Sequence, residues 1–91
     1  MLSKIRLAII AELLGAQWVS FSALQQATNT TNGNLGTHLG KLVDAGYVNE
    51  EKTFVDRRPQ SRYQLTQTGR DAFVGHVKSL EALLGAAQEK K

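Results

Sequence analysis

Apolar residues recur with helical spacing in four stretches of the chain and with strand-like spacing in shorter stretches between them. The four predicted helices cover residues 3–15, 22–28, 31–46 and 66–87. The third has the clearest pattern, because Leu35, Leu39 and Leu42 fall on one stripe while the opposite side is small and polar. We expect this helix to bury its leucines and to present its far side to a partner.

The first two helices have capping residues that suggest their bounds. Ser3 is a candidate N-cap and Gly15 a stop signal for the first helix. Its apolar arc is wide enough for one side to face the core and another a partner, and comprises Leu2, Leu7, Ile9, Ile10, Leu13 and Leu14. A β-prone run, residues 18–21, precedes the second helix. The predicted N-cap of this second helix is Ser22, and Gln25, three residues later, completes a capping box. The residues of this helix that we expect to be buried are Ala23, Leu24 and Ala27.

Thr31 or Asn32 is expected to cap the third helix, and Gly46 to end it. A hairpin is predicted next, since residues 47–55 and 61–65 are β-prone and flank the segment DRRPQ. Pro59 breaks the pattern there, so we expect a short loop with Arg57 and Arg58 at its tip and Arg62 on the returning strand. Tyr63 and Leu65 share one face of that strand.

The last helix has a seam that suits packing against another helix. Its apolar residues alternate at spacings of four and three, as Phe73, Val77, Leu80, Leu84 and Ala87. Thr66 is its predicted N-cap, and two internal glycines weaken it, so we expect it to depend on a partner surface. A chain of 91 residues, read as one domain (1–91), has a small core, which favours burial of this seam in a homodimer.

Charge is mildly basic overall, at +3, but it is concentrated. Between residues 52 and 70 Asp56 is the only acid, and the bases are Lys52, Arg57, Arg58, Arg62 and Arg70. A local excess of cations beside a helix with a small polar face favours nucleic acid as the partner.

Other function classes find little support in the residues. The sequence has no glycine-rich phosphate loop and no recognisable nucleophile or acid-base pair, so we predict no enzyme and no cofactor. Without cysteine, two histidines would need carboxylates or a second chain to hold a metal, and we predict no metal site. No run is long and apolar enough for a membrane span, so we expect a cytoplasmic protein with no membrane partner.

The order of the predicted elements and three segments resemble the MarR/ArsR-type winged-helix transcriptional regulators. The segments are GNLGTHLGKLVDAGYV (33–48), FVDRRPQSRYQLT (54–66) and TGRDAF (68–73). The chain departs from the family pattern at Gly36, where Ser is usual, and at Ser61, where Thr is common. The resemblance implies a mainly α fold with a small β-hairpin, a winged helix-turn-helix with a long C-terminal dimerisation helix.

The resemblance also implies sequence-specific binding to double-stranded DNA, as a homodimer on a palindromic operator. The candidate contacts on the recognition helix are Asn32, Asn34, Thr37, His38 and Lys41, and on the wing Arg57, Arg58 and Arg62. His38 borders the leucine stripe, so a packed structural histidine is the alternative for it. The expected dimer contacts are Leu7, Ile10, Phe73, Val77, Leu80 and Leu84. Other functions left open are protein or RNA binding and a ligand- or metal-responsive regulator; the arginine tip favours DNA.

Overall fold

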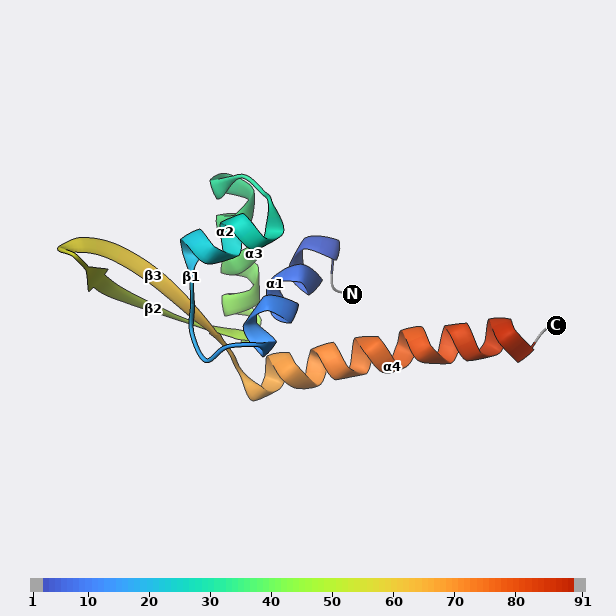
Figure 1. The fold of residues 1–91 in the computed structure, drawn as a ribbon. Coiled ribbons are helices and arrows are strands. Elements are labelled where there is room, and N and C mark those ends of the chain that lie inside the picture. Colours follow the sequence, from blue (N-terminus) through green and yellow to red (C-terminus); the bar gives the residue numbers. More distant parts are fainter. Residues whose placement is uncertain (1–2, 90–91) are drawn as a thin grey trace.

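The computed structural model describes the backbone of residues 3–89 and the side chains of residues 3–85. Its elements are α1 (Lys4–Leu14), β1 (Val19–Ser20), α2 (Phe21–Thr28), α3 (Asn32–Asp44), β2 (Val48–Val55), β3 (Arg58–Leu65) and α4 (Gln67–Glu89). The first three helices form a cluster, from which the β2–β3 hairpin projects on one side and α4 on the other (Figure 1). This arrangement confirms the predicted winged-helix architecture with a long last helix. Among the described residues, no helix is both long and apolar enough to cross a bilayer.

The observed N-caps of α1 and α3 are among the residues that the sequence predicted, whereas the N-cap of α2 is not. The Ser3 hydroxyl accepts from the Arg6 N–H, and the Thr31 hydroxyl from the Asn34 N–H, each at 3.2 Å. The prediction for α2 was wrong, because Ser20 is its N-cap and accepts from the Ala23 N–H at 3.1 Å. The helix therefore starts one residue before the predicted cap Ser22. Of its three buried candidates only Leu24 is buried, and the two alanines are exposed.

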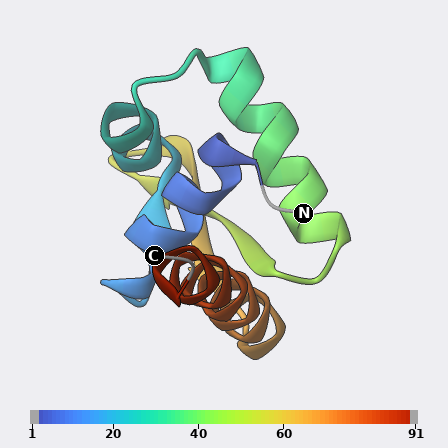
Figure 2. The same ribbon diagram turned by 90° about the vertical axis from the view of Figure 1, so that its right-hand side faces the viewer.

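The core joins the three clustered helices to the root of the hairpin. In Figure 2, α1 lies between α2 and α3. The predicted leucine stripe of α3 is fully buried, and the other core residues are Ile9, Ile10, Leu13, Leu24, Val48, Tyr63 and Leu65. Ile10 has no exposed surface, so its prediction as a dimer contact was wrong: the wide arc of α1 is largely used inside the chain. Leu2 and the side chain of Ala87 lie outside the described residues.

The three strands form an antiparallel sheet in the order β1-β3-β2. Val55 pairs with Arg58, so the connecting turn has only two residues, Asp56 and Arg57, with φ of 51° and 65°. Two consecutive residues with positive φ match the turn whose twist suits a tight hairpin. The expected loop through residue 60 was therefore too long. Val55 and Arg58 form the pair that closes the turn, and the next pair, Phe54 and Pro59, exchanges no backbone hydrogen bonds in this kind of ladder. Proline has no backbone N–H to donate, so it is tolerated at this position of β3.

The start of α4 is locked to the segment that follows α3. The Thr66 hydroxyl donates to the Gly46 carbonyl at 2.7 Å and accepts from the Gly69 N–H at 3.0 Å, which confirms the predicted cap. Gly69 is buried, and a Cβ there would collide with the Tyr47 carbonyl and the Leu65 side chain. A glycine is therefore required by close packing at this point.

Gly69→Ala should lower the free energy of unfolding by about 1 to 3 kcal/mol, because the helix must move away from the hairpin to admit a methyl group. Gly75→Ala is the matched control. No atom lies within 4 Å of its added Cβ, so it should stabilise α4 by up to about 1 kcal/mol. Urea denaturation of both variants measures the difference. Equal stability of the two would contradict the packing role of Gly69.

Candidate nucleic-acid interface

The outer face of α3 is smooth and polar. Gly33, Gly36 and Gly40 lie on it, and no atom lies within 4 Å of a Cβ placed at any of them. Thr37 and Lys41 are exposed beside these glycines, and Asn32 and Asn34 are exposed in the first turn. An uncluttered backbone with a few polar side chains allows close approach of a ligand surface along the whole helix.

Thr37 has part of its hydrogen-bonding capacity already used. Its hydroxyl donates to the Gly33 carbonyl at 3.0 Å, one helical turn back. The side chain is exposed, and a hydroxyl that donates one hydrogen bond can still accept another, so Thr37 can accept a hydrogen bond or make an apolar contact. Lys41 keeps its ammonium group free of ion pairs with the described residues.

His38 lies apart from this face. It is half-buried, and its Nδ1 accepts a hydrogen bond from Arg6 Nε at 3.3 Å. The bond joins α1 to α3 at the border of the leucine stripe, which supports the alternative of a structural histidine.

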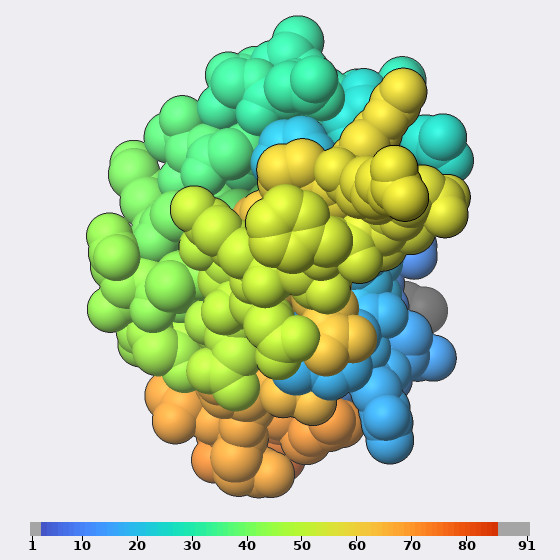
Figure 3. Space-filling model, turned by 90° about the vertical axis from the view of Figure 1, so that its left-hand side faces the viewer, coloured from blue at the N-terminus to red at the C-terminus, as the bar shows by residue number. Residues whose placement is uncertain are grey.

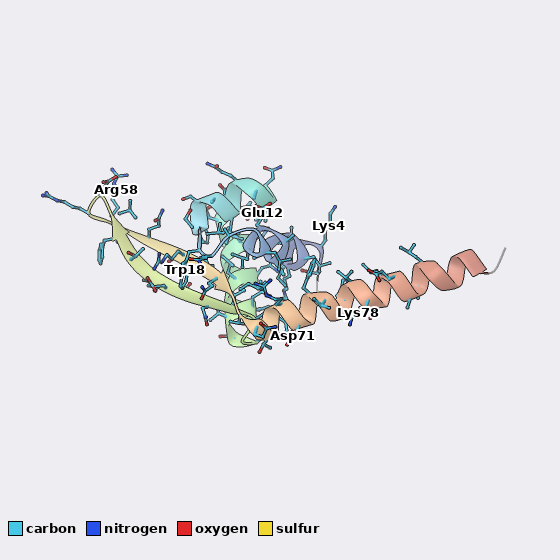
Figure 4. All side chains as sticks on the ribbon, turned by 60° about the horizontal axis from the view of Figure 1, so that its bottom comes forward. Lys4, Glu12, Trp18, Arg58, Asp71 and Lys78 are labelled. Carbon is cyan, nitrogen blue, oxygen red and sulfur yellow. The ribbon has the colours of Figure 1, made fainter. Side chains whose placement is uncertain are left out.

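The wing presents two unpaired arginines. Arg57 and Arg58 are exposed at the end of the hairpin, and neither forms an ion pair with any described residue. In Figure 4, Arg58 points away from the hairpin on the side of α2. The end-on view in Figure 3 shows the wing tip, in yellow-green and yellow, beside α3, in green. One end of the molecule therefore offers both the polar helix face and a pair of cations.

Arg62, predicted as a wing contact, differs from Arg57 and Arg58 because it has protein partners, although its side chain remains 37% exposed. Its Nε donates to Glu51 Oε1 at 3.0 Å, and the guanidinium carbon lies 4.4 Å from the centre of the Trp18 ring. Glu51 stands opposite Arg62 in the strand register, and their ion pair is the only one among the described residues. The sequence alone did not predict this ion pair, because Arg62 is known to stand opposite Glu51 only once the turn is known to have two residues.

The opposite face of the hairpin has a second link. The Tyr63 hydroxyl donates to Glu50 Oε2 at 2.7 Å, and Glu50 is its register partner. Burial, together with the nearby carboxylate, raises the pKa of Tyr63 to about 12. The phenol therefore stays protonated as a donor, and the root of the wing is tied on both faces.

The far half of α4 leaves an apolar face uncovered. Leu80, Leu83 and Leu84 are 48%, 68% and 64% exposed, whereas Phe73 and Val77 are half-buried, and Phe73 packs against the core. Of the expected dimer contacts, Leu80 and Leu84 are thus open, and Leu7 is half-buried. Figure 1 shows this part of the helix extending beyond the rest of the molecule.

Two other features bear on a ligand- or metal-responsive role. An open groove of about 480 Å³ lies beside α4, lined by Arg6, Ala45, Tyr47, Ala72, Gly75, His76 and Ser79. Within residues 3–85, no three His, Cys, Asp or Glu side chains gather closely enough to hold a metal ion.

Comparison with known proteins agrees with the geometry. The uncharacterized protein MJ0432 of Methanocaldococcus jannaschii is 35% identical over 75 residues, which cover 82% of each chain. A transcriptional regulator homologue from Pyrococcus horikoshii OT3 superimposes with a TM-score of 0.82 and 30% identity, over 91% of this chain and 82% of that one.

Bacillus subtilis PadR, solved in complex with operator DNA, shares the fold with a TM-score of 0.74 and 17% identity, over 82% of this chain and 48% of PadR. The family described as "Winged helix DNA-binding domain" matches residues 5–84, which include α3, the wing and most of α4. This family is one of DNA-binding modules and not of enzymes. On the strength of that match and of the relative in M. jannaschii, the chain belongs to the winged-helix DNA-binding domain family.

Proposed function

We propose that the protein is a homodimeric transcriptional regulator that binds double-stranded DNA sequence-specifically. The observation that carries this proposal is the pair of unpaired arginines at the wing tip beside the open polar face of α3. Cations that lack protein partners suit phosphates, which supply most of the affinity of such modules. The homology to a transcriptional regulator homologue from P. horikoshii and the fold shared with operator-bound PadR support the same function.

In the proposed complex α3 enters the major groove and the wing follows the backbone to the neighbouring minor groove. Thr37, Lys41 and Asn34 are the candidate base or phosphate contacts, because they project from the face opposite the buried leucines. The exposed Asn32 lies at the helix N-terminus, where the helix dipole favours a phosphate. The glycines between them let the backbone come close to the floor of the groove.

The second copy in the proposed dimer covers the open face of α4. This helix has 23 residues and is about 34 Å long, so two copies can pair over several turns beyond the clustered helices. A two-fold axis would set two α3 helices about 34 Å apart along one side of a duplex. The operator is then expected to be palindromic.

Duplex selection tests this function. Genomic fragments retained by the wild-type protein should share a two-fold symmetric site, and their binding should weaken steeply as salt rises. A-form RNA has a major groove too narrow for a helix, so duplex RNA of the same sequence should compete poorly. RNA binding, the competing function, predicts the reverse order of competition. Protein binding alone predicts no selected site.

Substitutions on the two faces of α3 should separate effects on DNA recognition from effects on the stability of the fold. Thr37→Ala and Lys41→Ala should leave thermal unfolding nearly unchanged, because both side chains are exposed. Each should reduce discrimination between selected and random duplexes by about 1 to 3 kcal/mol if it contacts a base. Leu39→Ala, on the buried face, should instead cost about 2 to 5 kcal/mol of stability. Similar unfolding by all three would refute the assignment of the faces.

A further inference from the structure

The wing tip carries a large apolar side chain that phosphate contacts leave unexplained. Phe54 is 74% exposed, the most exposed of the large hydrophobic residues in the described part of the chain. Its register partner is Pro59, one pair away from the two-residue turn. A single exposed aromatic residue is common on protein surfaces, but this one lies beside the two unpaired arginines of the turn, and that position makes it a candidate contact.

Strand geometry fixes the side on which Phe54 lies. Side chains alternate along β2, so Phe54 and its register partner Pro59 lie on one face of the wing tip. Val55 and its partner Arg58 are on the opposite face, and Arg58 lies on the side of α2 in Figure 4. Phe54 therefore lies on the face of the wing away from Arg58, and its strand β2 is the one that packs against α3. The wing tip that carries Phe54 lies beside α3 in the end-on view of Figure 3.

We propose that Phe54 is an apolar DNA contact that enters the minor groove next to the site of α3 and packs against the deoxyribose walls. The inference rests on the proposed function and assigns a second kind of contact to the wing. Charge complementarity commits it to DNA: Arg57 and Arg58 draw the tip to phosphates, and the sugars between those phosphates expose apolar C–H groups. Pro59 stiffens the strand opposite the ring.

A contact of this kind adds affinity without counterion release. Arginine contacts contribute a term that falls with salt, whereas burial of a phenyl ring against sugars contributes equally at low and high salt. The two contributions can therefore be separated by measuring affinity at several salt concentrations.

The test uses the full chain and a duplex of about 30 base pairs recovered by wild-type selection, long enough for two half-sites. Phe54→Ser should weaken binding about tenfold at every salt concentration, with the slope of log affinity against log salt unchanged. Hydroxyl-radical cleavage, which reports on deoxyribose in the minor groove, should lose protection in the segments flanking the major-groove contacts. Val55→Ser, on the opposite face, should change affinity by less than about twofold and keep the protection.

The outcomes separate this inference from the proposed function. Wild-type affinity for Phe54→Ser, or full minor-groove protection with that variant, overturns the role of Phe54 while DNA binding stands. A loss of affinity that disappears at high salt also overturns it, because the effect would then act through the arginines. If the wild-type protein selects no duplex at all, the proposed function itself fails. Thermal melting verifies that each variant is folded, which is expected because both side chains are exposed.

Discussion

Replacing both Leu80 and Leu84 by Glu is expected to turn a dimer into a monomer and to weaken operator binding about a hundredfold or more. Both side chains are about half or more exposed in the single chain, so the substitution removes nothing from the core. In a helix pair the same positions would bury two carboxylates per chain without partners, which is strongly unfavourable. In a dimer, binding of one subunit to its half-site holds the other subunit at a high effective concentration near the second half-site. A monomer loses this advantage and binds each half-site independently.

Sedimentation equilibrium and binding to the selected duplex measure the two parts of this prediction. The control is Lys78→Gln combined with Ala82→Glu, which makes the same change in net charge on the side of α4 away from the seam. It should remain dimeric and bind normally. A wild-type protein that sediments as a monomer at tens of micromolar would refute the dimer, as would unchanged sedimentation of the Leu80 and Leu84 variant.

Removing the two wing arginines should have the second large effect. Arg57→Gly with Arg58→Gln is the suitable variant, since Arg57 has a φ of 65° and glycine accepts this conformation without strain. Affinity at low salt should fall by about 10- to 100-fold for selected and random duplexes alike. The slope of log affinity against log salt should flatten by up to about 2 per subunit, or up to about 4 for the dimer. The loss follows from two phosphate contacts per subunit, made by arginines that form no ion pair with a described carboxylate.

Lys4→Gln with Lys78→Gln is the matched control for this charge change. Figure 4 shows both lysines away from the wing, and both are exposed. If affinity depends only on net charge, the two double variants should weaken binding equally. That result, or an unchanged salt slope for the arginine variant, would count against the wing as the source of phosphate contacts.

Periodicity predicted the elements well where a segment has one clear buried face. The stripe of Leu35, Leu39 and Leu42 is spaced for a helix and for nothing else, and all three are buried as expected. Local capping chemistry was less certain for α2. Ser20 and Ser22 both offer a hydroxyl, and the backbone conformation at Ser20, already extended in β1, decides between them.

The hairpin shows why candidate site residues were harder to assign than elements. The sequence places five basic residues within one segment, but only the register separates free cations from engaged ones. With a turn at Asp56 and Arg57, Arg62 falls opposite Glu51 and over Trp18, and its guanidinium is engaged with both. Arg57 and Arg58 have no such partners because the strands end there.

By itself the sequence determined the winged-helix order of elements, the buried face of α3 and the arginines at the wing tip, since these depend on spacing and composition within short segments. Only the tertiary structure decided which apolar and charged groups remain available. It buried Ile10 in the core, exposed Leu83 and Phe54, paired Arg62 with Glu51, and required a glycine at Gly69 against the Tyr47 carbonyl. The physical reason is that availability depends on contacts between residues far apart in the chain, which local periodicity does not contain.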